Sequence, residues 1–151
     1  MGVRAFVGVV LLVVMVPAAA SAAPEDVYGV WRTSDQQAAV ELSPCGPDLC
    51  GRLVWYVEKR TGADAGLDSK NPDETQRSRR LCGVLMIGNF RRKGDGWTGG
   101  WLYDPESGNT YSGTITPDGP DHLSLRGYIG IPLFGRTEHW TRAPANQQRC
   151  R

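Results

Sequence analysis

Short stretches with the alternation of a β-strand recur along this chain, each separated from the next by a turn signal, and strong helical periodicity is absent. Eight such stretches occur, at residues 27–33, 38–43, 49–58, 83–91, 97–103, 109–116, 122–129 and 134–142. Most of the connections are hairpin-like, which favours antiparallel pairing of consecutive strands. A meander that closes on itself leaves no exposed edge. The pattern predicts an all-β fold: a small antiparallel eight-stranded up-and-down β-barrel in a single domain at residues 23–142.

One connection interrupts this regular spacing. Residues 59–80 are polar and charged, and loops of this length inside compact domains are uncommon and often functional. Pro72 and the acids after it favour a short helix at residues 73–78. The acids between Asp68 and Glu74 lack the order of a known calcium loop. We interpret the segment as an exposed loop that can act as a lid or contact a partner.

The first residues have the layout of a secretory signal peptide. Arg4 precedes an apolar run at residues 5–16, Pro17 breaks that run, and the small residues 20–22 suit a cleavage site. Because a membrane span takes about 20 apolar residues, the run is too short for an anchor. We expect residues 1–22 to be removed on export, which would leave a periplasmic or secreted protein with no membrane span in the mature chain.

Four cysteines follow this leader: Cys45, Cys50, Cys82 and Cys150. Export permits disulfides, and four cysteines allow three pairings. The favoured pairing is Cys45–Cys50, which are close together around a Gly-Pro turn, with Cys82–Cys150. The second bridge would hold the polar C-terminal tail, residues 143–151, against the body of the protein.

Charge and residue types argue against several function classes. Of the 17 basic residues only Arg4 lies in the leader, which leaves 16 basic against 16 acidic residues in the mature chain. This balance provides no electrostatic footprint for nucleic acid and no polybasic cluster for an anionic membrane. Zinc is disfavoured because no C-x2-C pair exists and His122 and His139 lack ligand spacing. We expect a monomer without metal or cofactor.

No catalytic constellation stands out. Ser107 lies in a Glu-Ser-Gly turn rather than in G-x-S-x-G. A hydrolase needs a base near its nucleophile, and two histidines give few options. Asp104 and Glu106 are close in sequence, but nothing shows them flanking a substrate cleft. The sequence therefore predicts a protein that is not an enzyme and has no catalytic residues.

Several motifs together resemble a widespread family of small exported bacterial proteins classified only as a domain of unknown function. They are GVW from Gly29, LCGRLVWY from Leu49, NPD from Asn71, GGWLYDPESGNTY from Gly99 and RGYIGIPLFGRTEHWTR from Arg126. The resemblance spans nearly the whole mature chain and implies a lipocalin-like (calycin-type) β-barrel. It implies no activity, because the family has no established function.

A second resemblance concerns the closure of the barrel. Lipocalin-like barrels typically begin with Gly-x-Trp on the first strand, and an arginine from the last strand packs over that ring. Gly29 and Trp31 match the first element. Arg142 or Arg136 could match the second, and Arg142 is preferred. A guanidinium over an indole contributes about 0.5–2 kcal/mol, depending on burial.

Alternation assigns side chains to the faces of the strands. Leu53 and Trp55 are predicted to share one face, and Leu123, Leu125 and Ile129 are predicted to point inward.

The last strand places Arg136, Glu138 and Trp140 on one side. If that side is the interior, Arg136 and Glu138 would form an internal ion pair, either beside the closing tryptophan or at the base of a ligand pocket. If the other side faces inward, these charges are solvated.

An eight-stranded barrel either packs solid or holds one small ligand. Aromatic side chains on adjacent strands are available to line a cavity: Trp55, Trp97, Trp101, Tyr103 and Tyr111. We predict an interior site for a small apolar or amphipathic ligand. Its predicted wall consists of Trp31, Trp101, Tyr111, Arg136, Glu138 and Trp140. The alternative is a non-catalytic interaction protein of the cell envelope with a solid barrel core, acting through residues 59–80.

Overall fold

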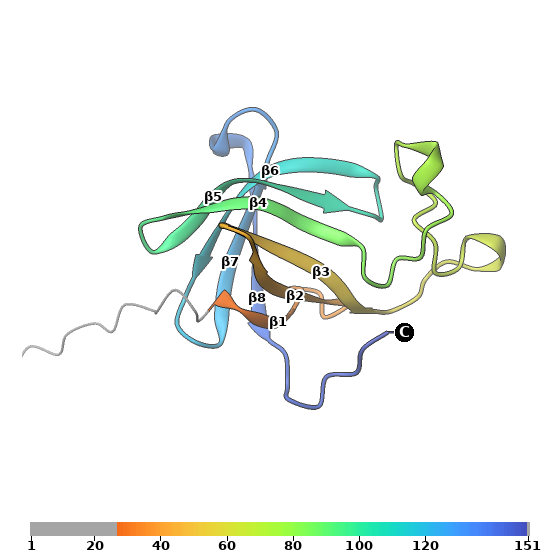
Figure 1. The fold of residues 1–151 in the computed structure, drawn as a ribbon, viewed down its shortest axis with the longest axis horizontal. Helices are drawn as coiled ribbons and strands as arrows, with labels where there is room; N and C mark the ends of the chain where they lie inside the picture. The colour runs from red at the N-terminus through yellow and green to blue at the C-terminus, as the bar shows by residue number, and fades with distance from the viewer. Residues whose placement is uncertain (1–26, 151) are drawn as a thin grey trace, which may run out of the picture.

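The computed structural model describes residues 27–150, which form a closed antiparallel barrel (Figure 1). Each strand pairs with the next, and the last pairs with the first. The strands are β1 (Gly29–Arg32), β2 (Ala38–Cys45), β3 (Asp48–Tyr56), β4 (Leu85–Lys93), β5 (Gly96–Asp104), β6 (Asn109–Pro117), β7 (His122–Tyr128) and β8 (Arg136–Arg142). The predicted eight-stranded barrel is therefore confirmed. The predicted signal peptide lies outside the described residues.

Closure of the barrel depends on a short ladder between β1 and β8. Trp31 stands opposite Arg142, and Arg32 stands opposite Thr141. The backbone N–H of Ala143 adds a hydrogen bond of 2.9 Å to the carbonyl of Val30. The first and last strands of the barrel thus pair with each other, so no strand is left with an open edge.

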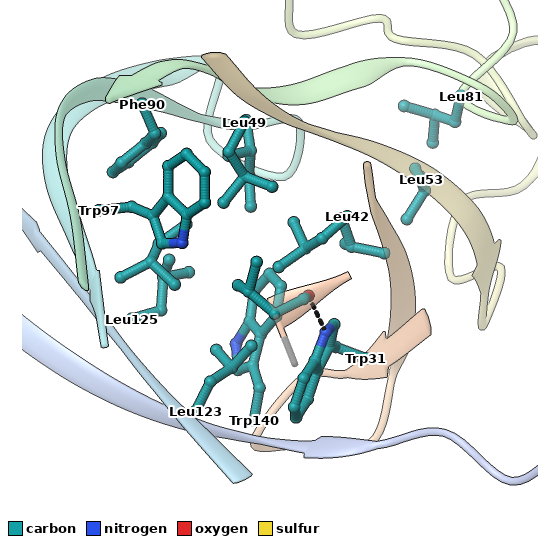
Figure 2. Close-up of a cluster of buried hydrophobic side chains, with 14 residues drawn as sticks. Trp31, Leu42, Leu49, Leu53, Leu81, Phe90, Trp97, Leu123, Leu125 and Trp140 are labelled. Carbon is teal, nitrogen blue, oxygen red and sulfur yellow. Dashed lines mark hydrogen bonds between the residues drawn. The ribbon is translucent and has the colours of Figure 1, made fainter. Parts of the chain in front are cut away.

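Large apolar side chains from all eight strands converge in the interior (Figure 2). Burying each of them stabilises the fold by about 1.5–3 kcal/mol relative to exposure. Gly51 makes room for this packing, because a Cβ at that position would lie 2.8 Å from Leu42 and 2.9 Å from Ile87. The buried cluster includes Trp31, Leu42, Leu49, Phe90, Trp97, Ile115 and Leu123.

A bulge between β2 and β3 changes which side chains share a face. The register shifts after Ala39, so that Val40 stands opposite Leu53 whereas Ala39 stands opposite Trp55. Leu53 belongs to the buried core, but Trp55 is only half-buried and lies under the guanidinium of Arg32 at 4.9 Å. The prediction that Leu53 and Trp55 share a face is wrong, because an extra residue in the ladder breaks the period of two.

The end of β7 brings a second correction. Leu123 and Leu125 are buried as predicted, but Ile129 is 73% exposed. The ladder between β7 and β8 stops at the pair Gly127 and Arg136. Ile129 therefore lies in the connecting loop, where strand alternation no longer determines the direction of a side chain.

The structure contains both favoured disulfides, Cys45–Cys50 at the β2–β3 turn and Cys82–Cys150. The second bridge joins the C-terminal segment to the β3–β4 connection. The backbone N–H of Cys150 also donates to the carbonyl of Val54 at 2.7 Å. Disulfides indicate an oxidising, extracytoplasmic compartment. Within residues 27–150, no helix has the length and apolar character needed to cross a membrane.

Candidate functional site

A cavity of about 660 Å3 opens at the end of the barrel where β1 connects to β2, β3 to β4, β5 to β6 and β7 to β8. The deep part of the cavity is lined by apolar side chains. Its rim carries uncharged polar side chains together with side chains of positive and negative charge. Four residues belong both to the cavity lining and to the buried core: Leu53, Leu81, Leu125 and Trp140. The core therefore forms the floor of the cavity, and Ala38, Met86 and Leu102 extend the apolar wall above it.

Strand β8 presents its charged face to this cavity. Arg136, Glu138 and Trp140 all line it, and their exposure falls from exposed through half-buried to 3% along the strand. Trp140 Nε1 donates a hydrogen bond of 3.1 Å to Glu138 Oε2, which orients the carboxylate.

The predicted ion pair between Arg136 and Glu138 is wrong for the described residues, where neither side chain forms an ion pair. Arg136 is the first residue of β8, at the rim, where water solvates its guanidinium.

Three tyrosines line the cavity. Tyr111, predicted as a wall residue, lines it together with Tyr56 and Tyr103. Burial, reinforced by the carboxylate of Glu58, raises the pKa of Tyr56, so this phenol remains a hydrogen-bond donor at neutral pH. Sequence alternation missed Tyr56 because the β2–β3 bulge moves it to the inner face.

The wall residues that we predicted divide into two groups. Tyr111, Arg136, Glu138 and Trp140 line the cavity, whereas Trp31 and Trp101 do not. Trp101 stands opposite Gly88 of β4, and its ring occupies the space next to that glycine.

The lining also contains aliphatic residues that were not among the predicted wall residues: Ala38, Leu53, Leu81, Met86, Leu102 and Leu125. In sequence they have the same alternating apolar signature as solid core, so no local signal separates the two.

Trp31 seals the opposite end of the barrel. It is fully buried, its Nε1 donates to the carbonyl of Val27 at 2.8 Å (Figure 2), and the Arg142 guanidinium lies 4.1 Å from its ring centroid. Arg142 Nη1 also donates to the carbonyl of Tyr28 at 2.8 Å. Gly29 permits this approach, because its φ is 119° and a Cβ there would lie 2.8 Å from Arg142 Nη1. Arg142 is thus the arginine at the closed end.

The β3–β4 connection is anchored by a buried carboxylate. Asp68 is fully buried and accepts hydrogen bonds from Tyr103 Oη at 2.5 Å, Asn71 Nδ2 at 2.8 Å and Arg79 Nε at 2.9 Å. Burial, strengthened by the hydrogen bond to Asp68, raises the pKa of Tyr103 to about 12. A buried charge satisfied in this way holds the loop to β5 instead of destabilising the fold.

Further contacts place this loop beside the cavity. Arg60 donates to the carbonyls of Leu67 at 2.8 Å and Pro105 at 2.7 Å. Lys59 and Glu106 form an ion pair at 3.1 Å. Lys59, Arg60, Lys70 and Leu81 consequently belong to the cavity lining, so the loop forms part of the wall.

The predicted helix at residues 73–78 is shorter than expected. It is a single 3-10 turn, η3 (Glu74–Gln76), preceded along the loop by a similar turn, η2 (Gly62–Asp64). Asp73 accepts hydrogen bonds from Thr75 Oγ1 at 2.7 Å and from the backbone N–H of Thr75 at 3.0 Å, and the hydrogen bond from the hydroxyl contributes most to lowering the Asp73 pKa. The hydrogen bond of Arg77 Nε to the Asn71 carbonyl, at 2.8 Å, ties the turn to the anchored segment.

Within residues 27–150, no cluster of three or more His, Cys, Asp or Glu side chains is arranged to hold a metal ion. Ser107 Oγ donates to Asp104 Oδ2 at 2.6 Å, so this hydroxyl stabilises the β5–β6 turn. Ser124 Oγ lies 3.1 Å from His139 Nδ1, but neither residue lines the main cavity.

Comparison with known proteins places the chain in a family. The model of the family described as "Uncharacterized protein conserved in bacteria (DUF2147)" matches residues 29–142. Among solved structures, the chain is similar to HP1028 from Helicobacter pylori, which is described as belonging to the lipocalin family. The two are 20% identical, with a TM-score of 0.67 over 79% of this chain and 84% of that one. This likeness shows a shared lipocalin-like fold. No curated protein gives a significant match.

Proposed function

The chain belongs to the DUF2147 family, and we propose that it is an exported protein that binds one small apolar or amphipathic molecule in the open half of its lipocalin-like barrel. The observation that carries the proposal is the cavity of about 660 Å3. Sites for small molecules are typically concave, mostly apolar and about 300–1,000 Å3 in volume, with a few placed polar groups. The cavity has each of these properties.

The lining favours a ligand with an apolar tail and a polar end. Met86, Leu102 and Trp140 surround the deep part of the cavity. A tail placed there gains about 0.8 kcal/mol for each buried methylene group. The polar end would lie nearer the rim, where Glu138 and Arg136 supply an acceptor and a donor.

Export is supported by two independent features. The leader pattern of residues 1–22 predicts secretion, and two disulfides favour an oxidising compartment. Intact mass measurement of the protein purified from its own host tests this part of the proposal. We expect a chain that begins at Ala23, and a chain that retains residues 1–22 would contradict export by a cleaved signal peptide.

Binding without catalysis is also part of the proposal. The cavity lining contains no serine, histidine or free cysteine, so it lacks the nucleophile–base pair of a serine or cysteine hydrolase. A ligand incubated with the protein should therefore be recovered chemically unchanged. Turnover of the recovered molecule, detected by mass spectrometry, would contradict this.

A substitution that fills the cavity tests the site directly. Ala38 lines the cavity, so Ala38→Phe should occupy part of its volume. Ala145→Phe makes the same change on the exposed C-terminal segment and serves as the matched control. With 1-N-phenylnaphthylamine as a neutral fluorescent probe, we expect at least roughly tenfold weaker binding for Ala38→Phe, equivalent to about 1.4 kcal/mol, and wild-type binding for the control.

Native mass spectrometry of the protein from its own host should reveal a co-purifying amphiphile. If no bound species is found and Ala38→Phe binds the probe as well as wild type does, the cavity is not a binding site. The alternative, an envelope interaction protein that acts through residues 59–80, would then replace this proposal.

A further inference from the structure

The largest concentration of exposed apolar side chains lies in one short loop. Of the five large apolar residues exposed within residues 27–150, four lie at residues 129–134, which we call the mouth loop. The exposed fractions are 73% for Ile129, 53% for Ile131, 76% for Leu133 and 79% for Phe134. Single exposed apolar residues are normal, but a contiguous group marks a surface that contacts something apolar.

The mouth loop has a fixed shape. Arg126 Nε donates to the carbonyl of Pro132 at 3.0 Å, and its Nη1 donates to Thr137 Oγ1 at 2.9 Å. Pro132 begins a 3-10 turn, η4 (Pro132–Phe134), which the backbone N–H of Gly135 closes with a 3.0 Å hydrogen bond to the Pro132 carbonyl. These bonds hold the loop as a tip that projects beyond β7 and β8, at the top of Figure 1.

The tip stands beside the opening of the cavity. Gly127 and Arg136, where the β7–β8 ladder ends on either side of the loop, both line the cavity. Val57, the fifth exposed apolar residue, lines the same opening and is 42% exposed. The exposed apolar surface is therefore gathered where an apolar ligand would enter or leave.

We propose that the mouth loop inserts into the surface of a lipid bilayer, so that the ligand passes between membrane and cavity without crossing water. This inference rests on the proposed function. An apolar molecule that leaves the cavity into water loses the transfer free energy that binds it. A cavity opening placed against the bilayer avoids that loss.

The size and shape of the tip favour a bilayer over a protein partner. A stable protein interface takes roughly 20–30 residues on each side, whereas the mouth loop has six. Its apolar residues also form a projecting tip. A fluid lipid interface accommodates a projection, since apolar side chains enter the boundary between headgroups and acyl chains.

Charges at the rim predict how binding depends on lipid composition. The arginines beside the loop, Arg126 and Arg136, form no ion pair within residues 27–150. Asp35 and Glu138 also lie along the rim and offset their charge. Insertion of apolar side chains should therefore dominate, with binding to zwitterionic vesicles and only a modest gain from anionic lipid.

Flotation with phosphatidylcholine vesicles, with and without phosphatidylglycerol, tests the inference on the full-length mature protein. Wild type should float with both kinds of vesicle. Leu133→Ser combined with Phe134→Ser should reduce partitioning at least roughly tenfold, because two exposed apolar anchors are lost. Circular dichroism and thermal unfolding of this variant should match wild type, since both side chains are mostly in water.

A crossed control separates the two proposals. The loop variant should still bind 1-N-phenylnaphthylamine in solution, and Ala38→Phe should still float with vesicles. Absence of wild-type flotation, or equal flotation of the loop variant, would overturn membrane insertion and leave ligand binding intact. A concentration-dependent dimer that the loop variant abolishes, without vesicle binding, would mean that a second copy covers the loop, which also overturns the inference.

Discussion

The two ends of the barrel are built from the same eight strands but are filled differently. At the closed end, Trp31 is fully buried and Arg142 covers its ring at 4.1 Å. At the open end, Glu138 and Tyr111 face a cavity of about 660 Å3. Well-packed interiors supply stability, and cavities forfeit part of it. A barrel stabilised at one end can therefore remain hollow at the other, which leaves that end available for binding.

The strongest test of this comparison is Trp31→Ala at the closed end. Trp31 is 0% exposed and in the core, so we expect a loss of about 3–5 kcal/mol in the free energy of unfolding, measured with urea. Trp101→Ala, which removes a half-buried tryptophan outside the buried cluster, is the matched control and should lose clearly less. Equal losses would mean that the closed end contributes no special stability.

The disulfides give the next largest expected effect. Cys82 and Cys150 are 68 residues apart, whereas Cys45 and Cys50 are separated by 5. Chain-entropy arguments predict that the double serine variant of the long-range pair loses about 4 kcal/mol and that of the short-range pair about 2 kcal/mol. Urea unfolding of both variants measures the difference. If the variant without the short-range bridge lost more stability than the variant without the long-range bridge, the C-terminal segment would be held mainly by contacts such as the 2.6 Å ion pair of Arg149 with Glu41.

Tyr103→Phe tests how firmly the loop is attached at the open end. The variant removes a hydrogen bond to the buried Asp68 carboxylate, so it should lose about 1.5–3 kcal/mol at neutral pH. Proteolysis should then begin within residues 59–80 while the barrel remains folded. Tyr111→Phe, which alters a cavity tyrosine outside this cluster, should leave the loop resistant.

The raised pKa of Tyr103 predicts that the free energy of unfolding depends on pH. Because the folded-state pKa of Tyr103 is raised from 10.0 to about 12, its contribution to stability is fully present below pH 10 and is lost as the pH rises toward 12. Wild type should lose more stability over this window than Tyr103→Phe does. Parallel curves for the two proteins would contradict the proposed bond to Asp68.

The smallest expected effect concerns the polar end of the ligand. Glu138→Gln keeps an oxygen for the Trp140 hydrogen bond, so stability should change little. Binding of dodecylamine should weaken by roughly two- to fivefold because one half-exposed charge is lost. Binding of dodecanol, which carries no charge, is the control and should be unchanged. An equal effect on both ligands would show that the polar end does not approach Glu138.

Individual residues show which features of the fold the sequence predicted correctly and which it did not. The period of two located all eight strands and assigned Leu123 and Leu125 to the interior, because strand alternation follows from local backbone geometry. It was wrong at Trp55 and Ile129, where a bulge and the end of a ladder interrupt pairing. In the sequence, Asp68 is one of several acids in a polar loop. It is a buried anchor only because the fold brings its carboxylate within hydrogen-bonding distance of Tyr103 on β5.

By itself, the sequence pattern predicted a closed eight-stranded barrel and favoured one of three disulfide pairings, and the resemblance to lipocalin-like barrels implied the approach of Arg142 to Trp31. Only the tertiary structure decided that one end is hollow. Residues such as Leu102 and Met86 have the same apolar character whether they fill a core or line a cavity. The difference is the volume left between side chains that face one another across the barrel, and no single strand contains that information.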